Sequence, residues 1–306
     1  MAGFRRTVSL PVLAAAAKRT AYKIRSASLP VRFHPIVSRL NDDVASLVSW
    51  SSSCTQSPSA KWLSEGASRI SVVLTSLFEL MQHPLAVDQL RDSLVTSDIS
   101  EDLLRLVDSY DTFRLALLNL AQLQAETRAS FRRQNQSRIA LAVRAQRLAT
   151  CELEQLASTT QEAAQTEPPS PGTTTASEDA AGVSTLLLSL CSAMAALAAA
   201  STVVFVGLAA LSDQSTMLPT PTIAVGPTKV SRATTRTTWM AGVMQWRSRA
   251  KKQAAVEEER KARKAALDQF DMLEECIKDM ESRTEEFYRG LVRARVFLLN
   301  VLSSRC

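Results

Sequence analysis

The chain has 306 residues, of which 46% are hydrophobic, 22% are charged and only 8 are glycine. A chain rich in Leu, Ala, Ser, Arg and Glu but this poor in glycine suits helices, and it argues against all-β and α/β folds, which need many turns. The net charge of +6 identifies no partner by itself. The composition therefore predicts an all-α protein.

The charge is unevenly placed along the chain. Residues 1–41 contain eight Lys or Arg and no acidic residue, and residues 229–264 contain eleven Lys or Arg against three Glu. The remainder of the chain is therefore net negative. We expect an anionic partner to meet the two basic segments first.

Histidines and cysteines offer little for catalysis. His34 and His83 are the only histidines, each directly before a proline, and no glycine-rich nucleotide loop is present. The five cysteines are scattered and do not form a zinc or redox motif: Cys54, Cys151, Cys191, Cys276 and Cys306. We expect reduced thiols in an intracellular, cytoplasmic protein that has no cofactor or metal and is not an enzyme.

The first 35 residues are predicted to form a disordered basic arm, since prolines interrupt any long helix. The arm holds two similar motifs: Arg25 precedes Ser28 by three residues and Pro30 follows it by two, while Arg6, Ser9 and Pro11 repeat this spacing. A basic residue at minus three favours basophilic kinases, and a phosphoserine before proline suits the arginine-lined groove of 14-3-3 proteins. Ser28, and then Ser9, are the candidate phosphorylation sites.

Other roles for the arm stay open. Such an arm can be inert, or it can be an organelle transit peptide, because it is rich in Arg and Ser and free of acids. It can also contact an anionic membrane. Nucleic-acid binding is not expected, because Trp239 and Trp246 are its only aromatic support near the second basic segment.

Residues 36–158 are predicted to supply the N-terminal helices of a bundle. Apolar spacing indicates helices from residue 36, over 60–81, and over 100–124 with Ser100 as N-cap, followed by a more polar helical stretch at 125–156. His83 and Pro84 are expected to form a turn. Several arginines give the polar stretch a basic outer face: Arg128, Arg132, Arg133, Arg138, Arg144 and Arg147.

Two proline-containing linkers, 159–182 and 212–238, are predicted to flank an Ala-rich helix at 183–211. This helix has no charged residue and is long enough to cross a bilayer, for which roughly 20 apolar residues suffice. A helix buried on all sides by the bundle has the same composition. Both alternatives remain, although the many Ala and Ser residues favour burial.

The C-terminal region, 239–306, is predicted to be a basic segment followed by a long, coiled-coil-like helix. Its apolar residues recur at spacings of three and four, interrupted by Thr284, and charged residues fill the other face. The apolar stripe comprises Phe270, Leu273, Ile277, Met280, Phe287, Leu291, Ala294, Leu298 and Val301. The whole chain is thus expected to form an elongated helical bundle.

Three stretches resemble the plant BYPASS-related family. Residues 25–35 are similar to the family's Arg-Ser-x-Ser-Leu-Pro and His-Pro signature, residues 101–113 to its central helix, and residues 291–302 to its C-terminal ending. The resemblance implies a role in root and shoot development and assigns no catalytic residue.

We therefore expect a non-enzymatic regulator or scaffold that binds protein partners through its helical surface or its phosphorylated arm. The alternative is a protein attached to a membrane through residues 186–211. The sequence does not fix the oligomeric state.

Overall fold

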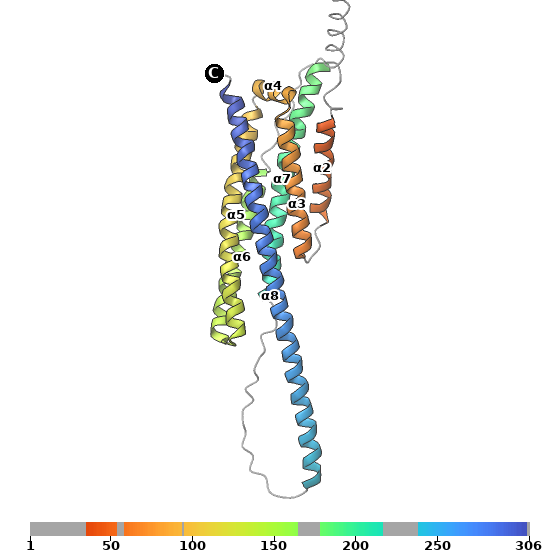
Figure 1. Cartoon of the computed structure of the whole chain (residues 1–306), viewed down its shortest axis with the longest axis vertical. Helices are drawn as coiled ribbons and strands as arrows, with labels where there is room; N and C mark the ends of the chain where they lie inside the picture. The colour runs from red at the N-terminus through yellow and green to blue at the C-terminus, as the bar shows by residue number, and fades with distance from the viewer. Residues whose placement is uncertain (1–34, 54–57, 94, 165–177, 217–237, 305–306) are drawn as a thin grey trace, which may run out of the picture.

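The computed structural model describes residues 35–53, 58–93, 95–164, 178–216 and 238–304. These residues form an all-α structure of seven helices without a strand, which confirms the predicted fold class. The helices are α2 (Pro35–Ser52), α3 (Ala60–Met81), α4 (Pro84–Asp92), α5 (Val95–Arg132), α6 (Gln136–Ala164), α7 (Glu178–Thr216) and α8 (Thr238–Ser303). They make an elongated bundle, and the N-terminal part of α8 extends well beyond its other helices (Figure 1).

The Ala-rich helix α7 lies at the centre of this bundle. It packs against α2, α3, α5, α6 and α8, and its small side chains let these neighbours approach closely. By length and composition, Thr185–Thr216 is able to cross a membrane, yet 67% of its most apolar window is buried inside the protein. Among the described residues, α7 is therefore the core helix onto which the others pack.

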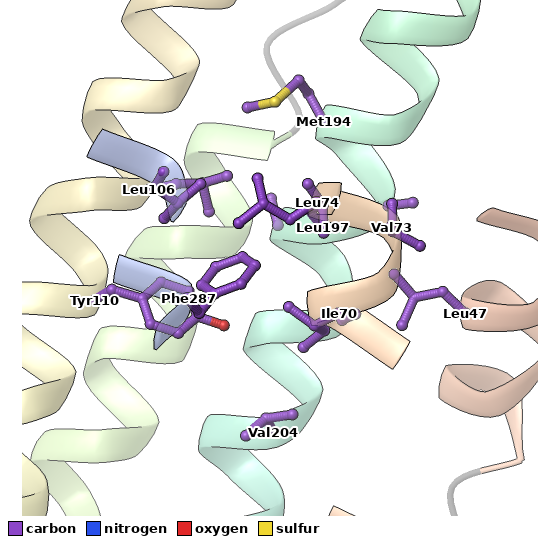
Figure 2. Packing of buried hydrophobic residues seen from close by; sticks show 14 of the residues in the cluster. Leu47, Ile70, Val73, Leu74, Leu106, Tyr110, Met194, Leu197, Val204 and Phe287 are labelled. Carbon is purple, nitrogen blue, oxygen red and sulfur yellow. The ribbon is translucent and has the colours of Figure 1, made fainter. Parts of the chain in front are cut away.

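Aromatic side chains from three helices meet beside α7. Tyr110 and Phe113 of α5 contact Phe205 of α7, and Phe287 of α8 packs against Tyr110 with its ring tilted. The ring centroids are 4.3 Å apart for Phe113 and Phe205 and 4.4 Å apart for Tyr110 and Phe287. Aliphatic residues of α3, α5 and α7 surround this cluster (Figure 2). The Tyr110 hydroxyl is 2.9 Å from Ser201 Oγ, and burial raises the pKa of Tyr110 far above its usual value. The buried phenol thus stays neutral and hydrogen-bonded.

The apolar stripe of α8 packs along α5 and α3, as its spacing predicts. All nine residues of the stripe are buried. Thr284, which interrupts the stripe, is buried with them. The stripe therefore continues through the polar residue, and the charged face of α8 stays outside.

A buried polar network joins the end of α7 to α5 and α6. Gln146 of α6 donates to Ser212 Oγ and Ser215 Oγ, each at 3.0 Å, and accepts from Thr127 Oγ1 at 3.1 Å. Gln146 is fully buried. Because a buried amide needs these partners, the network fixes the position of α7 relative to α5 and α6.

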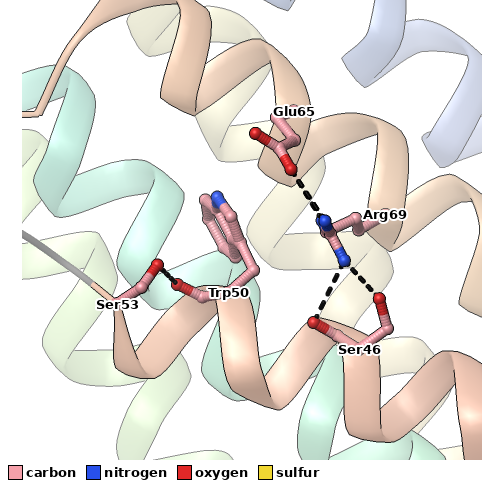
Figure 3. A network of polar contacts seen from close by, with 5 residues as sticks. All are labelled: Ser46, Trp50, Ser53, Glu65 and Arg69. Atoms are coloured by element: carbon pink, nitrogen blue, oxygen red, sulfur yellow. Dashed lines mark hydrogen bonds and ion pairs between the residues drawn. The ribbon is translucent and has the colours of Figure 1, made fainter.

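The contact between α2 and α3 combines close packing with a polar bridge. Gly66 of α3 lies against the Trp50 ring so tightly that an added Cβ would be 2.0 Å from a ring carbon. Figure 3 shows the bridge beside it, in which Arg69 donates to Glu65 Oε1 at 2.7 Å and to the carbonyl and hydroxyl oxygens of Ser46. Because Gly66 has no Cβ, the Trp50 ring of α2 can lie directly against the backbone of α3 here.

The prediction that a helix begins at Ser100 is wrong. The helix α5 begins at Val95, and Ser100 lies buried within it. Ser93 Oγ accepts a hydrogen bond from the Val95 amide at 3.1 Å. The polar side chain that binds a backbone amide at the start of α5 therefore lies seven residues before the predicted Ser100. The expected end near residue 124 is also wrong, because α5 continues to Arg132.

Two further differences concern turns. The predicted turn at His83 and Pro84 leads directly into α4, a helix that was not predicted from the sequence. The helical stretch expected over 125–156 is interrupted between α5 and α6, where Gln134 has a φ of 56° and Asn135 Oδ1 accepts from the Arg138 amide. This break lets α6 fold back along α5.

Helical residues extend into both predicted linkers. The helix α6 ends at Ala164, α7 covers Glu178–Thr216, and α8 begins at Thr238. The centres of the linkers, and the basic arm that was predicted to be disordered, lie outside the described residues.

Candidate functional site: a polar groove between α5 and α8

A groove of about 520 Å³ runs between the antiparallel helices α5 and α8. Three alanines spaced four residues apart on α5 line it, Ala121, Ala125 and Ala129, and Ile277 of α8 lies opposite. Residues four apart occupy one face of a helix, and alanine fills little of the space between two helices. The groove exists because these positions carry methyl groups.

Charged side chains surround this apolar strip. They are Arg128, Arg132 and Arg133 of α5, and Glu274, Lys278 and Glu281 of α8. The lining therefore carries four cationic and two anionic groups. Gln124 also lines the groove, and its side-chain amide donates to the Phe270 carbonyl.

An ion-pair cluster joins the two walls. Arg128 contacts both Asp271 and Glu274, and Lys278 Nζ lies 2.8 Å from Glu274 Oε1. The hydrogen bond from Lys278 and the positive charges of Lys278 and Arg128 lower the pKa of Glu274. The carboxylate therefore stays ionised at neutral pH and ties α5 to α8.

The cluster predicts a pH-dependent contribution to stability. Because the folded-state pKa of Glu274 is depressed, its contribution is present above the unfolded-state value near 4.5 and is lost as the pH falls through the folded-state pKa. The ion pair between Glu274 and Lys278 is largely exposed, so we expect it to contribute only about 0.5 kcal/mol to the free energy of unfolding. Urea unfolding at several pH values should show that Glu274→Gln loses this stability at neutral pH and matches the parent protein in acid. An equal difference at both pH values would contradict this assignment.

Arg132 and Arg133 add two further cationic groups to the lining of the groove. Neither side chain forms an ion pair with any acid in the described part of the chain. Arg128 contributes a buried Nε that has no hydrogen-bond partner among the same residues. Guanidinium groups bind carboxylates and phosphates through paired hydrogen bonds. The arrangement is thus suited to holding an anionic group above an apolar strip.

The residues predicted as sites from the sequence are not among those that the structure describes. Ser28, Arg25 and Pro30, and likewise Ser9, Arg6 and Pro11, fall outside the described residues, so the structure does not place either motif. The sequence did indicate a basic outer face that includes Arg128, Arg132 and Arg133. It did not indicate the groove, although the alanines at intervals of four were visible.

Comparison with known proteins identifies one family. The model of the family described as Protein BPS1 matches residues 68–301, which covers most of α3 and all of α4 to α7, together with nearly all of α8. No curated protein and no solved structure matches the chain. The matched span includes the groove, the buried α7 and the apolar stripe of α8. The chain therefore belongs to the BPS1 family, as its resemblance to BYPASS-related proteins predicts.

Proposed function

We propose that this protein is a non-enzymatic regulator or scaffold in root and shoot development. Membership of the BPS1 family suggests a plant developmental regulatory protein. The observation that carries the scaffold role is the burial of α7, because the most apolar helix of the chain is covered by its neighbours while the charged faces of α5 and α8 remain outside. Those outer faces, including the groove, are the surfaces offered to protein partners.

Burial of α7 also favours a water-soluble bundle over a membrane-spanning protein. A spanning α7 would have to leave the aromatic cluster around Phe205 and the partners of Ser201 and Ser212. The helices that cover it carry charged outer faces, such as Glu285 and Arg289 on α8, which hydrocarbon would not accommodate. This arrangement supports the proposal of a cytoplasmic protein that contacts membranes at most through its basic segments.

Carbonate extraction tests this proposal against membrane anchoring. The full chain with a C-terminal fluorescent tag is expressed in plant cells, and the membrane pellet is washed with alkaline carbonate. Release of the protein into the supernatant is expected, since carbonate strips peripheral proteins and leaves spanning ones. Retention in the pellet would support the alternative, an anchor through residues 186–211.

The basic arm supplies the proposed regulation. Arg25, Ser28 and Pro30 have the spacing of a phosphorylated motif that binds 14-3-3 proteins, and Arg6, Ser9 and Pro11 repeat it. After treatment with a basophilic kinase, the full chain should bind immobilised 14-3-3 protein, and Ser28→Ala should remove most of the binding. Ser9→Ala is the matched control with the smaller expected loss. Unchanged binding of the Ser28→Ala protein would overturn this role.

A further inference from the structure

Two leucines and a cysteine are exposed along the middle of the outward face of α6, where Arg144 lies between the leucines. Leu141 is 69% exposed and Leu148 is 61% exposed, and Cys151 is exposed one turn further on. The opposite face, with Ala149 and Leu153, is buried against α5 and α7. The chain therefore has an outer helical stripe that nothing in the described part of the protein covers.

Charged residues on α6 are sorted by sign along the helix. The first half carries Arg138, Arg144 and Arg147, and the second half carries Glu152, Glu154 and Glu162. None of these six side chains forms an ion pair within the described residues, whereas α5 and α8 contain many. Unpaired charges sorted in this way are complementary to the same helix in the reverse direction.

We propose that α6 pairs with α6 of a second copy of this chain in an antiparallel arrangement with two-fold symmetry. In a two-fold interface the same patch serves both copies, so each contact occurs twice. This inference does not depend on the proposed developmental function.

Helical geometry selects the residues that meet. Arg147 and Glu154 are seven residues apart, so they lie about 10.5 Å from each other on the same side of α6. When two antiparallel helices cross at the midpoint between them, Arg147 faces Glu154 of the second copy, and Glu154 faces its Arg147. The same register places Cys151 opposite Cys151 of the second copy, close to the crossing point, and brings Leu148 beside Gln155 of the second copy at the other edge of the contact.

The alternatives fit the charges less well. A parallel pair of α6 helices would place the arginines of both copies together and the glutamates together, which is unfavourable. In the antiparallel pair, the arginine-bearing half of each α6 lies beside the glutamate-bearing half of the other, so two identical chains complement each other. One helix face is a small interface, so we expect a dimer with a dissociation constant of about micromolar order.

Sedimentation of the full chain tests the proposal. Over about 1 to 200 µM, the protein should shift from the monomer mass of 33.4 kDa to twice that mass. Arg147→Glu and Glu154→Arg should each weaken the dimer about tenfold or more, because each places like charges opposite one another twice. Helical circular dichroism should be unchanged, because both residues are exposed.

Mixing the two variants gives the decisive result. A copy carrying Arg147→Glu and a copy carrying Glu154→Arg are complementary at both contacts, so the mixture should dimerise although each variant alone remains largely monomeric. Lys61→Glu, an equal charge change at an exposed position on α3, should leave the dimer intact. A monomeric parent protein at the highest concentration, single variants that dimerise normally, or a mixture that stays monomeric would each overturn the proposal.

Discussion

Phe205→Ala is expected to lower the free energy of unfolding by about 3 to 5 kcal/mol, the cost typical of removing a buried aromatic side chain. Phe205 is fully buried on α7 and contacts both Tyr110 and Phe113. Removing the ring leaves a cavity that rigid neighbouring helices fill only partly. The loss should be large because α7 is the helix shared by most of the bundle.

Val206→Ala is the matched control on the same helix, since Val206 is 45% exposed. Its expected effect is within about 0.5 kcal/mol, as for most surface substitutions. Urea unfolding followed by circular dichroism measures both variants in buffer without detergent. Equal, small effects of the two substitutions would contradict the burial of Phe205 in the core.

Gln146→Glu is expected to destabilise the protein strongly at neutral pH and much less in acid. The change keeps the shape of the side chain but places a carboxylate in a fully buried site near Asp213, which accepts a hydrogen bond from Thr150. Burial raises the folded-state pKa of such a group above its unfolded value of about 4.3. The buried charge therefore costs no stability below that pH. Its cost to the free energy of unfolding grows as the pH rises and levels off above the folded-state pKa at up to about 4 kcal/mol.

The control for this prediction is Gln161→Glu, at an exposed position near the end of α6. It should change stability by less than about 0.5 kcal/mol at either pH. Urea unfolding at about pH 5 and pH 8 separates the two sites. A penalty for Gln146→Glu that does not depend on pH would mean that residue 146 is open to water.

The helical stripes could be predicted because they depend on local periodicity. Leu103, Tyr110 and Phe113 on α5, like Phe270 and Leu291 on α8, repeat at helical spacing, and burial follows directly from that spacing. The bounds of α3 were predictable for the same reason. Thr284 shows that one polar residue does not interrupt such a stripe when the residues on either side are buried.

The start of α5 and the place of α7 depend on contacts between distant segments. Thr96 is buried and donates to the Leu90 carbonyl, so packing against α4 extends α5 past the Ser100 expected as its N-cap. For α7, an uncharged, mostly apolar sequence is compatible with both lipid and a protein core, although its many Ala and Ser residues favour the core. Only its neighbours, such as Tyr110 and Gln146, distinguish the two environments.

The groove could not be predicted, because its two walls are about 150 residues apart in the sequence. Arg128 lies near Glu274 only once α8 packs antiparallel to α5. The regular alanines of α5 suggest a close helix contact, yet in the structure they line an open groove against α8. The sequence therefore shows the cations and not the space between them.

Hydrogen exchange measured by mass spectrometry, in buffer without detergent, tests the central claim most directly. If α7 is the core helix of a water-soluble bundle, amides of residues 186–211 should be among the slowest to exchange, and those of residues 257–264, on the exposed part of α8, among the fastest. Fast exchange throughout 186–211, or protein that stays soluble only in detergent, would contradict the account and support a membrane-spanning α7.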